Sequence, residues 1–259
     1  MKILTLLTMS ALTVALSAET IKFDLVKDFG TKNYSTVEGD ALTVKGPQFL
    51  QFKKMKFDPA AKYTMSLDVK AAGKVAPQIC LIGFFCYDKN GRQIWHHNVQ
   101  PVGGSATVLA ADAKVGDTTL TVKNAVRWNV SQYAVFHAKA DYSDLPNFEL
   151  ARIKAKAKKG NVWVVTLTAP LKKAYAAGTA MRAHSPGGYV YLNTRIKGAA
   201  DWKTYTGSAK GFNPGVNGGR PEKFWPGTVS VAPIMLINWN WSVRDSAVQL
   251  RNFTLTVEK

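Results

Sequence analysis

The chain has 259 residues, a formal net charge of +17 at pH 7 and only two cysteines. This length accommodates one large domain or two smaller ones, and two cysteines are too few for a disulfide-built scaffold. The positive charge favours polyanionic partners such as acidic or sulfated glycans, lipopolysaccharide, anionic surfaces or nucleic acid, but charge alone does not choose among them.

The first residues have the pattern of an export signal. Lys2 precedes a largely apolar run over residues 3–16, small residues follow, and the first acid is Glu19. This order predicts a secretory signal peptide over residues 1–18, and the run is shorter than the roughly 20 residues that a transmembrane helix needs. We therefore expect a secreted, periplasmic or cell-surface protein after cleavage near residue 18, with no transmembrane segment.

Apolar and polar residues alternate with a period of two along much of the chain. Residues 63–70 alternate strictly, which predicts a strand with one face in water. Residues 79–87 are apolar on both faces and suit a central strand. The turn Asp88–Gly91 contains Asn-Gly, which favours a hairpin, so residues 92–99 are predicted to return as the partner strand.

Both cysteines lie in the predicted central strand. Cys80 and Cys86 are six residues apart, which separates them by roughly 20 Å in an extended chain. A disulfide needs Cα atoms within about 7 Å of each other. We expect two buried free thiols.

Two strands are predicted near the end of the chain, at residues 229–238 and 247–257. In the second one the apolar phase shifts at Arg251 and Asn252, which indicates a β-bulge.

The middle of the chain differs in texture, with short predicted strands at 134–138, 149–157 and 162–167. Glycine- and proline-containing breaks bound it on both sides. The pattern therefore predicts an all-β fold in which a β-sandwich, residues 19–103 and 186–259, is interrupted by a small β-rich inserted module at residues 104–185.

Two segments of the predicted sandwich resemble a known family. Residues 57–71, with the run Lys-Tyr-Thr-Met-Ser-Leu-Asp-Val-Lys-Ala, and residues 248–255 are similar to the galactose-binding-like jelly-roll modules appended to bacterial glycan-degrading enzymes. The resemblance implies a jelly-roll β-sandwich and carbohydrate binding. Family members often hold a structural calcium against an acid of the final strand, where this chain has Arg251 and Asn252. We therefore expect no cofactor.

The inserted block resembles the small β modules of phage tail fibres and surface proteins. The residues that carry this likeness are Thr107, Leu109, Gly116, Asp117, Leu120–Val122, Leu167–Leu171 and Tyr175–Gly178. This second likeness implies a fold and no chemistry.

Aromatic side chains are the best candidates for a binding site, because a flat ring stacks on the apolar face of a sugar. The candidate ligand-binding residues are Trp225, Trp241, Trp239, Trp202, Trp95 and His97, with Trp225 and Trp241 ranked first. The alternative is that any one of these rings packs in the core.

Metal sites are not predicted. On a regular strand the adjacent His96 and His97 would face opposite sides, so they could not share a metal. A histidine of this pair is instead a candidate polar contact. The oxygen-rich segment Asp141–Asn147 could hold calcium but reads better as a turn.

A basic stretch follows in the module. Arg152, Lys154, Lys156 and Lys158 alternate with small or apolar residues, so a regular strand would carry all four cations on one face. This ribbon is the candidate polyanion-binding site. The alternative is a solvated, lysine-protected sheet face. Nucleic acid is not expected as partner, because export is predicted and no helix suits the major groove.

Catalysis is not predicted. The serine-hydrolase motif Gly-x-Ser-x-Gly is absent, and acids are scarce. The sequence thus predicts a secreted, non-catalytic carbohydrate-binding protein for a glycan that is anionic. Two alternatives stay open. One is a β-jelly-roll polysaccharide lyase using residues of the set His96, His97, Tyr189, Tyr191 and Arg195, and the other is a structural or adhesive surface protein. The oligomeric state is not indicated.

Overall fold

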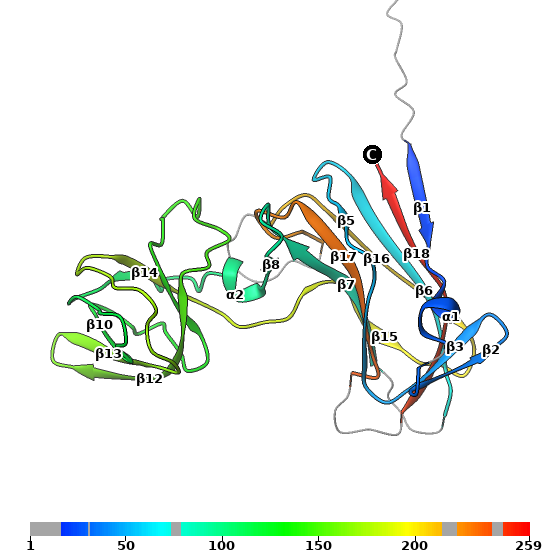
Figure 1. Cartoon of the computed structure of the whole chain (residues 1–259), viewed down its shortest axis with the longest axis horizontal. Helices are drawn as coiled ribbons and strands as arrows, with labels where there is room; N and C mark the ends of the chain where they lie inside the picture. Colours follow the sequence, from blue (N-terminus) through cyan, green and yellow to red (C-terminus); the bar gives the residue numbers. More distant parts are fainter. Residues whose placement is uncertain (1–16, 31, 74–78, 214–221, 240–245) are drawn as a thin grey trace, which may run out of the picture.

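The protein is built almost wholly from antiparallel β-strands, as the period-two pattern predicts (Figure 1). The computed structural model describes residues 17–259 except 31, 74–78, 214–221 and 240–245. The described strands form three six-stranded sheets. Two short helices, α1 (Leu25–Phe29) and α2 (His96–Val99), accompany them. Most of the predicted leader lies outside the described residues.

The first sheet has the strand order β16-β6-β18-β3-β2, and β1 pairs with the far end of β18. Its strands are β1 (Ala18–Lys22), β2 (Ser35–Glu38), β3 (Ala41–Lys45), β6 (Lys62–Ala71), β16 (Lys203–Lys210) and β18 (Ala247–Glu258).

The second sheet has the order β15-β7-β17-β4, with β5 on β17 and β8 on β7. Its strands are β4 (Gln48–Gln51), β5 (Met55–Lys56), β7 (Ile79–Tyr87), β8 (Gln93–Ile94), β15 (Val190–Lys197) and β17 (Ser230–Ile237).

The third sheet is made only of strands from the middle of the chain, in the order β10-β13-β12-β11-β14-β9. Its strands are β9 (Thr107–Val108), β10 (Thr119–Val122), β11 (Tyr133–Phe136), β12 (Leu150–Lys159), β13 (Val162–Leu167) and β14 (Ala180–His184). We call this part of the chain the module. It lies beside the other two sheets, with α2 between them (Figure 1).

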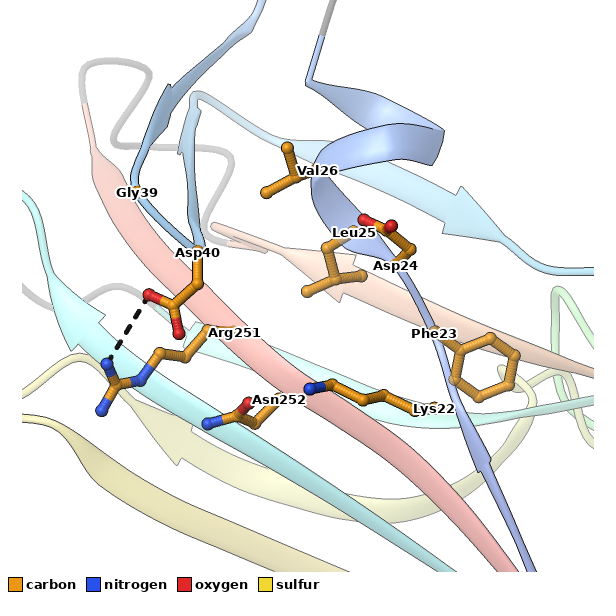
Figure 2. Close-up of a pocket in the computed structure, with 9 residues that line it drawn as sticks. All are labelled: Lys22, Phe23, Asp24, Leu25, Val26, Gly39, Asp40, Arg251 and Asn252. Carbon is orange, nitrogen blue, oxygen red and sulfur yellow. Dashed lines mark ion pairs between the residues drawn. The ribbon is translucent and has the colours of Figure 1, made fainter.

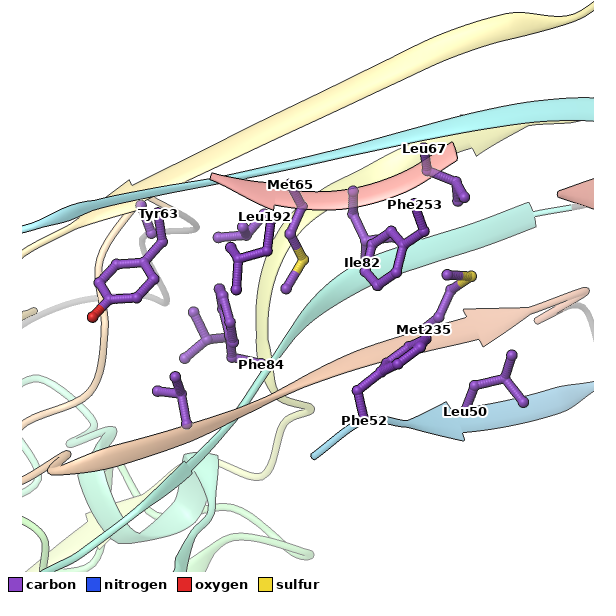
Figure 3. Packing of buried hydrophobic residues seen from close by; sticks show 14 of the residues in the cluster. Leu50, Phe52, Tyr63, Met65, Leu67, Ile82, Phe84, Leu192, Met235 and Phe253 are labelled. Atoms are coloured by element: carbon purple, nitrogen blue, oxygen red, sulfur yellow. The ribbon is translucent and has the colours of Figure 1, made fainter. Parts of the chain in front are cut away.

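The first two sheets pack face to face as a β-sandwich. Alternate residues of β6, such as Met65 and Leu67, are fully buried against Ile82, Phe84 and Met235 of the second sheet (Figure 3). The prediction from the strict alternation of β6 is therefore confirmed: one face of the strand is buried, and the other face carries the polar residues.

The module has a core of its own. Trp128 is fully buried, and its indole nitrogen donates a hydrogen bond to the carbonyl of Ser105 (2.8 Å). Phe136 stacks on Tyr175 with ring centroids 3.8 Å apart. This cluster and the sandwich core are separate hydrophobic clusters.

Two sequence predictions about the sandwich are confirmed. The pairing of β18 with β6 shifts between Arg251 and Thr254, and Asn252 has φ = 52°, so the bulge is present. Cys80 and Cys86 are buried and unpaired, and burial raises the pKa of each thiol to about 12.

The prediction of a returning strand over 92–99 is wrong beyond Ile94. The hairpin turn is present, with Gly91 at φ = 75°, but β8 ends at once and the chain turns into α2. Trp95 precedes this helix, and the Asn98 side chain accepts a hydrogen bond from the Trp95 backbone N–H (2.8 Å). Because His96 and His97 lie in this helix, their side chains do not alternate between two faces as they would on a strand.

Candidate functional site

The second sheet is apolar on both faces. One face of β7 packs in the sandwich core, while Phe85 and Tyr87 point to the opposite side. There they join Ala232, Ile234 and Leu236 of β17 in a second cluster that lies outside the sandwich core. The two-sided apolar run of β7 therefore serves two different surfaces.

Aromatic rings cover this outer face. We call the set Phe49, Phe85, Trp95, Tyr189 and Tyr191 the aromatic platform. Tyr189 is its centre, with ring centroids 4.5 Å from Phe85, 5.6 Å from Trp95 and 5.9 Å from both Phe49 and Tyr191. Phe85 is buried, whereas Phe49 and Trp95 remain 38% and 37% exposed. The platform thus combines ring-to-ring support with rings open to solvent.

The row of rings continues into the module. Trp95 is parallel to His97, with an interplanar angle of 4° and centroids 6.2 Å apart. His97 in turn stacks on Tyr133 of β11 at 4.2 Å. One succession of rings therefore runs from the sandwich, over α2, to the module.

Hydrogen bonds hold α2 against the module. The Asn98 side chain donates to the carbonyl of Asn147 (3.0 Å), and the Asn147 N–H donates to the carbonyl of Asn98 (2.8 Å). These hydrogen bonds fix Asn98, and with it the neighbouring His97, at the boundary between the module and the platform.

The histidines of this junction are neutral near neutral pH. Arg182 Nε donates to His184 Nε2 (2.7 Å), so the His184 proton sits on Nδ1, which donates to the carbonyl of His97 (2.8 Å). Burial lowers the pKa of His184 to about 4. Burial, and then the neighbouring His96, lowers the pKa of His97 to about 4. The platform therefore carries no histidine charge.

The structure does not gather the predicted tryptophans in one site. Trp225 is 3% exposed in the sandwich core, so its predicted role as an exposed stacking ring is wrong. Its ring lies roughly perpendicular to the His96 ring, with centroids 6.3 Å apart. Trp239 is half-buried against the outer cluster of the second sheet. Trp241 lies outside the described residues.

Trp202 directly precedes β16 of the first sheet and contacts Arg251 of β18, not the platform. The Arg251 guanidinium lies over its ring at 4.2 Å. Of the predicted rings, Trp95, His97 and Trp239 therefore lie on or beside the second sheet, and Trp202 lies beside the first.

The bulge of β18 lines a pocket of about 460 Å³, where Arg251 Nη1 faces Asp40 at 3.8 Å (Figure 2). Asn252 and Thr204 both donate hydrogen bonds to Asp68, at 2.8 and 2.7 Å. Burial acts to raise the pKa of Asp68, but these hydrogen bonds and the Arg251 charge outweigh it and hold the pKa below its usual range. The carboxylate is thus satisfied by protein groups.

No group of three possible metal ligands occurs among the residues that the structure describes. The Asp141–Asn147 segment forms a turn, as predicted. Asp141 accepts from the Ser143 N–H (3.0 Å), and Asp144 pairs with the buried Arg182.

The four cations of the predicted ribbon do not share one face. Ile153 pairs with the buried Leu167, but a bulge follows, and Lys156 then pairs with the buried Val165. Residues opposite each other on paired strands point to the same side, so Lys156 and Lys158 leave the strand on the side that Ile153 faces. Lys156 donates to the carbonyl of Ala125 (2.8 Å).

Arg152 lies before the bulge, where it pairs with Tyr133 of β11. It therefore shares the face that turns toward α2. The single-face prediction is wrong because one extra residue, Lys154, reverses the alternation.

Two of the residues proposed for a lyase are tyrosines whose pKa values are raised. Burial raises the pKa of Tyr189, and burial with the neighbouring Tyr189 raises the pKa of Tyr191 to about 12. Arg195 lies further along β15, past an irregularity in its pairing with β7. A tyrosine base needs a lowered pKa, so this environment works against proton abstraction.

Sequence reasoning missed Phe49, Phe85 and Tyr133 as site residues, and it named Tyr189 and Tyr191 only for the lyase alternative. The signal was present in part, since aromatic residues alternate at Phe85 and Tyr87 and again at Tyr189 and Tyr191. Side chains two apart share a strand face, so two aromatic faces were predictable but their meeting was not.

Fold and site together define an all-β protein, with a two-sheet sandwich whose outer face carries an aromatic platform that reaches a second β unit. No protein-family model, curated protein or solved structure matches the chain. In the described part of the chain, no helix has the length and apolar character needed to cross a membrane.

Proposed function

We propose that this is a non-catalytic carbohydrate-binding protein that uses the aromatic platform as its glycan site. The supporting observation is the platform itself, in which Trp95 and Phe49 are partly exposed while both contact the rings of Phe85 and Tyr189. Rings stack on the C–H face of a pyranose. Rings already fixed by their neighbours lose little entropy on binding. The proposal therefore follows from exposure combined with rigidity.

Two features support binding rather than catalysis at this face. The pKa of Tyr191 is raised to about 12 by burial, so the phenol stays protonated and serves as a hydrogen-bond donor for a sugar hydroxyl. The histidine next to Trp95 is neutral near pH 7 because its pKa is lowered to about 4. A purely structural role would not require Phe49 and Trp95 to be open to solvent.

Export supports the same proposal, since a secreted protein meets glycans outside the cell. The pattern of the first 18 residues is the argument for export.

The test removes one ring of the platform and one ring elsewhere. Trp95→Ala should weaken glycan binding at least about tenfold, which corresponds to about 1.4 kcal/mol. Phe212→Ala is the matched control, because Phe212 is 41% exposed and lies outside the platform. A glycan array would find the ligands, and calorimetry would measure Kd. Unchanged affinity in Trp95→Ala, or equal losses in both variants, would refute the proposal.

A further inference from the structure

A second cavity lies in the module at the end of the ring succession. It has a volume of about 390 Å³, and its lining includes Tyr133, Phe148, Glu149, Arg152, Lys172 and Lys173. We call it the module pocket. Tyr133 belongs to both structures, because the same ring stacks on His97 at 4.2 Å. The pocket therefore begins where the succession of rings Trp95, His97 and Tyr133 ends.

The charge of the module pocket is positive. Its one lining acid, Glu149, pairs through Oε1 with Lys173 and through Oε2 with His137. The hydrogen bond from Lys173, and then that from His137, hold the pKa of Glu149 below its usual range. Glu149 is thus ionised and neutralised by partners of its own.

Two cations remain in the pocket without a carboxylate. No acid among the described residues lies in ion-pair contact with Arg152 or Lys172, and both side chains are exposed. An unpaired guanidinium next to a cavity is suited to a planar anion, because its N–H groups bind carboxylate or sulfate oxygens in pairs.

The strand register brings one of these cations beside the shared ring. Arg152 of β12 is directly opposite Tyr133 of β11, so the two side chains leave the same face with Cβ atoms roughly 5 Å apart. Phe148 adds a further ring to the lining. A sugar ring in the pocket would thus have aromatic surface beside it and a cation within reach of its charged substituent.

We propose that the module pocket binds an anionic residue of the glycan, carrying a carboxylate or a sulfate group, whose neighbouring sugars lie on the aromatic platform. This inference rests on the proposed function and names its ligand class. Arg152 and Lys172 hold the anionic group, and Tyr133 connects the pocket to the platform. The module thereby selects for charge, while the sandwich supplies stacking.

The experiment compares three oligosaccharides of equal length: one neutral, one built of uronic acids and one sulfated. At about 0.15 M salt, the wild-type protein should bind at least one charged oligosaccharide about tenfold more tightly than the neutral one. The double variant R152Q/K172Q should lose this preference and keep its affinity for the neutral chain. Preference for the uronate or for the sulfate identifies the group that the pocket takes.

The matched control is K154Q/K158Q, which also removes two positive charges, both from β12, but alters no residue that lines the pocket. It should keep the preference. Equal losses in the two double variants would overturn the inference and indicate an unspecific charge effect. If the wild-type protein bound neutral and charged chains with equal affinity, this inference would be overturned, while the proposed function would stand. Binding of no oligosaccharide would overturn both.

Discussion

The junction between sandwich and module should weaken in acid because of His184. This side chain is fully buried, accepts a hydrogen bond from Arg182 and donates one to the carbonyl of His97. The carboxylate of Asp144, whose side chain is 8% exposed, forms an ion pair with Arg182. Protonation would place a second donor, with a positive charge, against the Arg182 N–H. Burial is the main physical reason for the low pKa of His184, and this conflict with the Arg182 charge adds to it.

The magnitude follows from the pKa difference between the folded and unfolded chain. An unfolded histidine takes up its proton near pH 6.5, whereas folded His184 does so only near pH 4. The unfolded state therefore binds more protons in this window, so the free energy of unfolding is intact above about pH 6.5 and falls as the pH drops toward 4. A difference of about 2.5 pKa units corresponds to about 3 kcal/mol, of which most is lost by pH 4.5.

Urea unfolding at pH 7.0 and at pH 4.5 measures this loss. His184→Gln keeps an acceptor for Arg182 and a donor for the His97 carbonyl but cannot titrate. The variant should be somewhat less stable at pH 7 and should lose about 2 kcal/mol less than the wild type on acidification. Equal acid losses in both proteins would refute the reasoning. An NMR titration that found the His184 pKa near 6.5 would refute it independently.

Three further predictions concern the framework of the site. Gly83→Ala should destabilise the sandwich by about 2 kcal/mol or more in urea unfolding, because its Cβ would lie 2.1 Å from a backbone oxygen of β15; unchanged stability would contradict the close packing of β15 on β7. Trp128→Phe should cost about 1–3 kcal/mol by the same assay, since it leaves the buried Ser105 carbonyl without its donor; a neutral effect would mean that water replaces the indole. Cys80 and Cys86 should not react with a thiol reagent at pH 8 in the folded protein, because their pKa values are raised to about 12, and both should react in urea. Rapid labelling of the native protein would show that β7 opens.

The strands of the sandwich were predictable where a local pattern carried the information. The run over 79–87 is β7 to the residue, and alternation over 63–70 identified β6. The bulge at Arg251 and Asn252 could be read from a shift of apolar phase. The prediction of a strand over 92–99 was wrong because the hydrogen bond between Asn98 and Asn147 holds helix α2 in place. A local pattern of apolar residues does not reveal a contact between residues so far apart in the sequence.

The candidate site separates more clearly what the sequence determines from what only the tertiary structure decides. The sequence by itself determined that the protein is all-β, that one strand is apolar on both sides and that aromatic and basic residues are abundant, because these properties depend on composition and on period two. Only the tertiary structure decided that Trp225 is core, that Trp95 is open and that a bulge splits the four cations. It also decided that Tyr133 of the module meets His97 of the sandwich. Exposure and proximity depend on which distant strands pair and in which register, and that choice is made by packing of the whole chain.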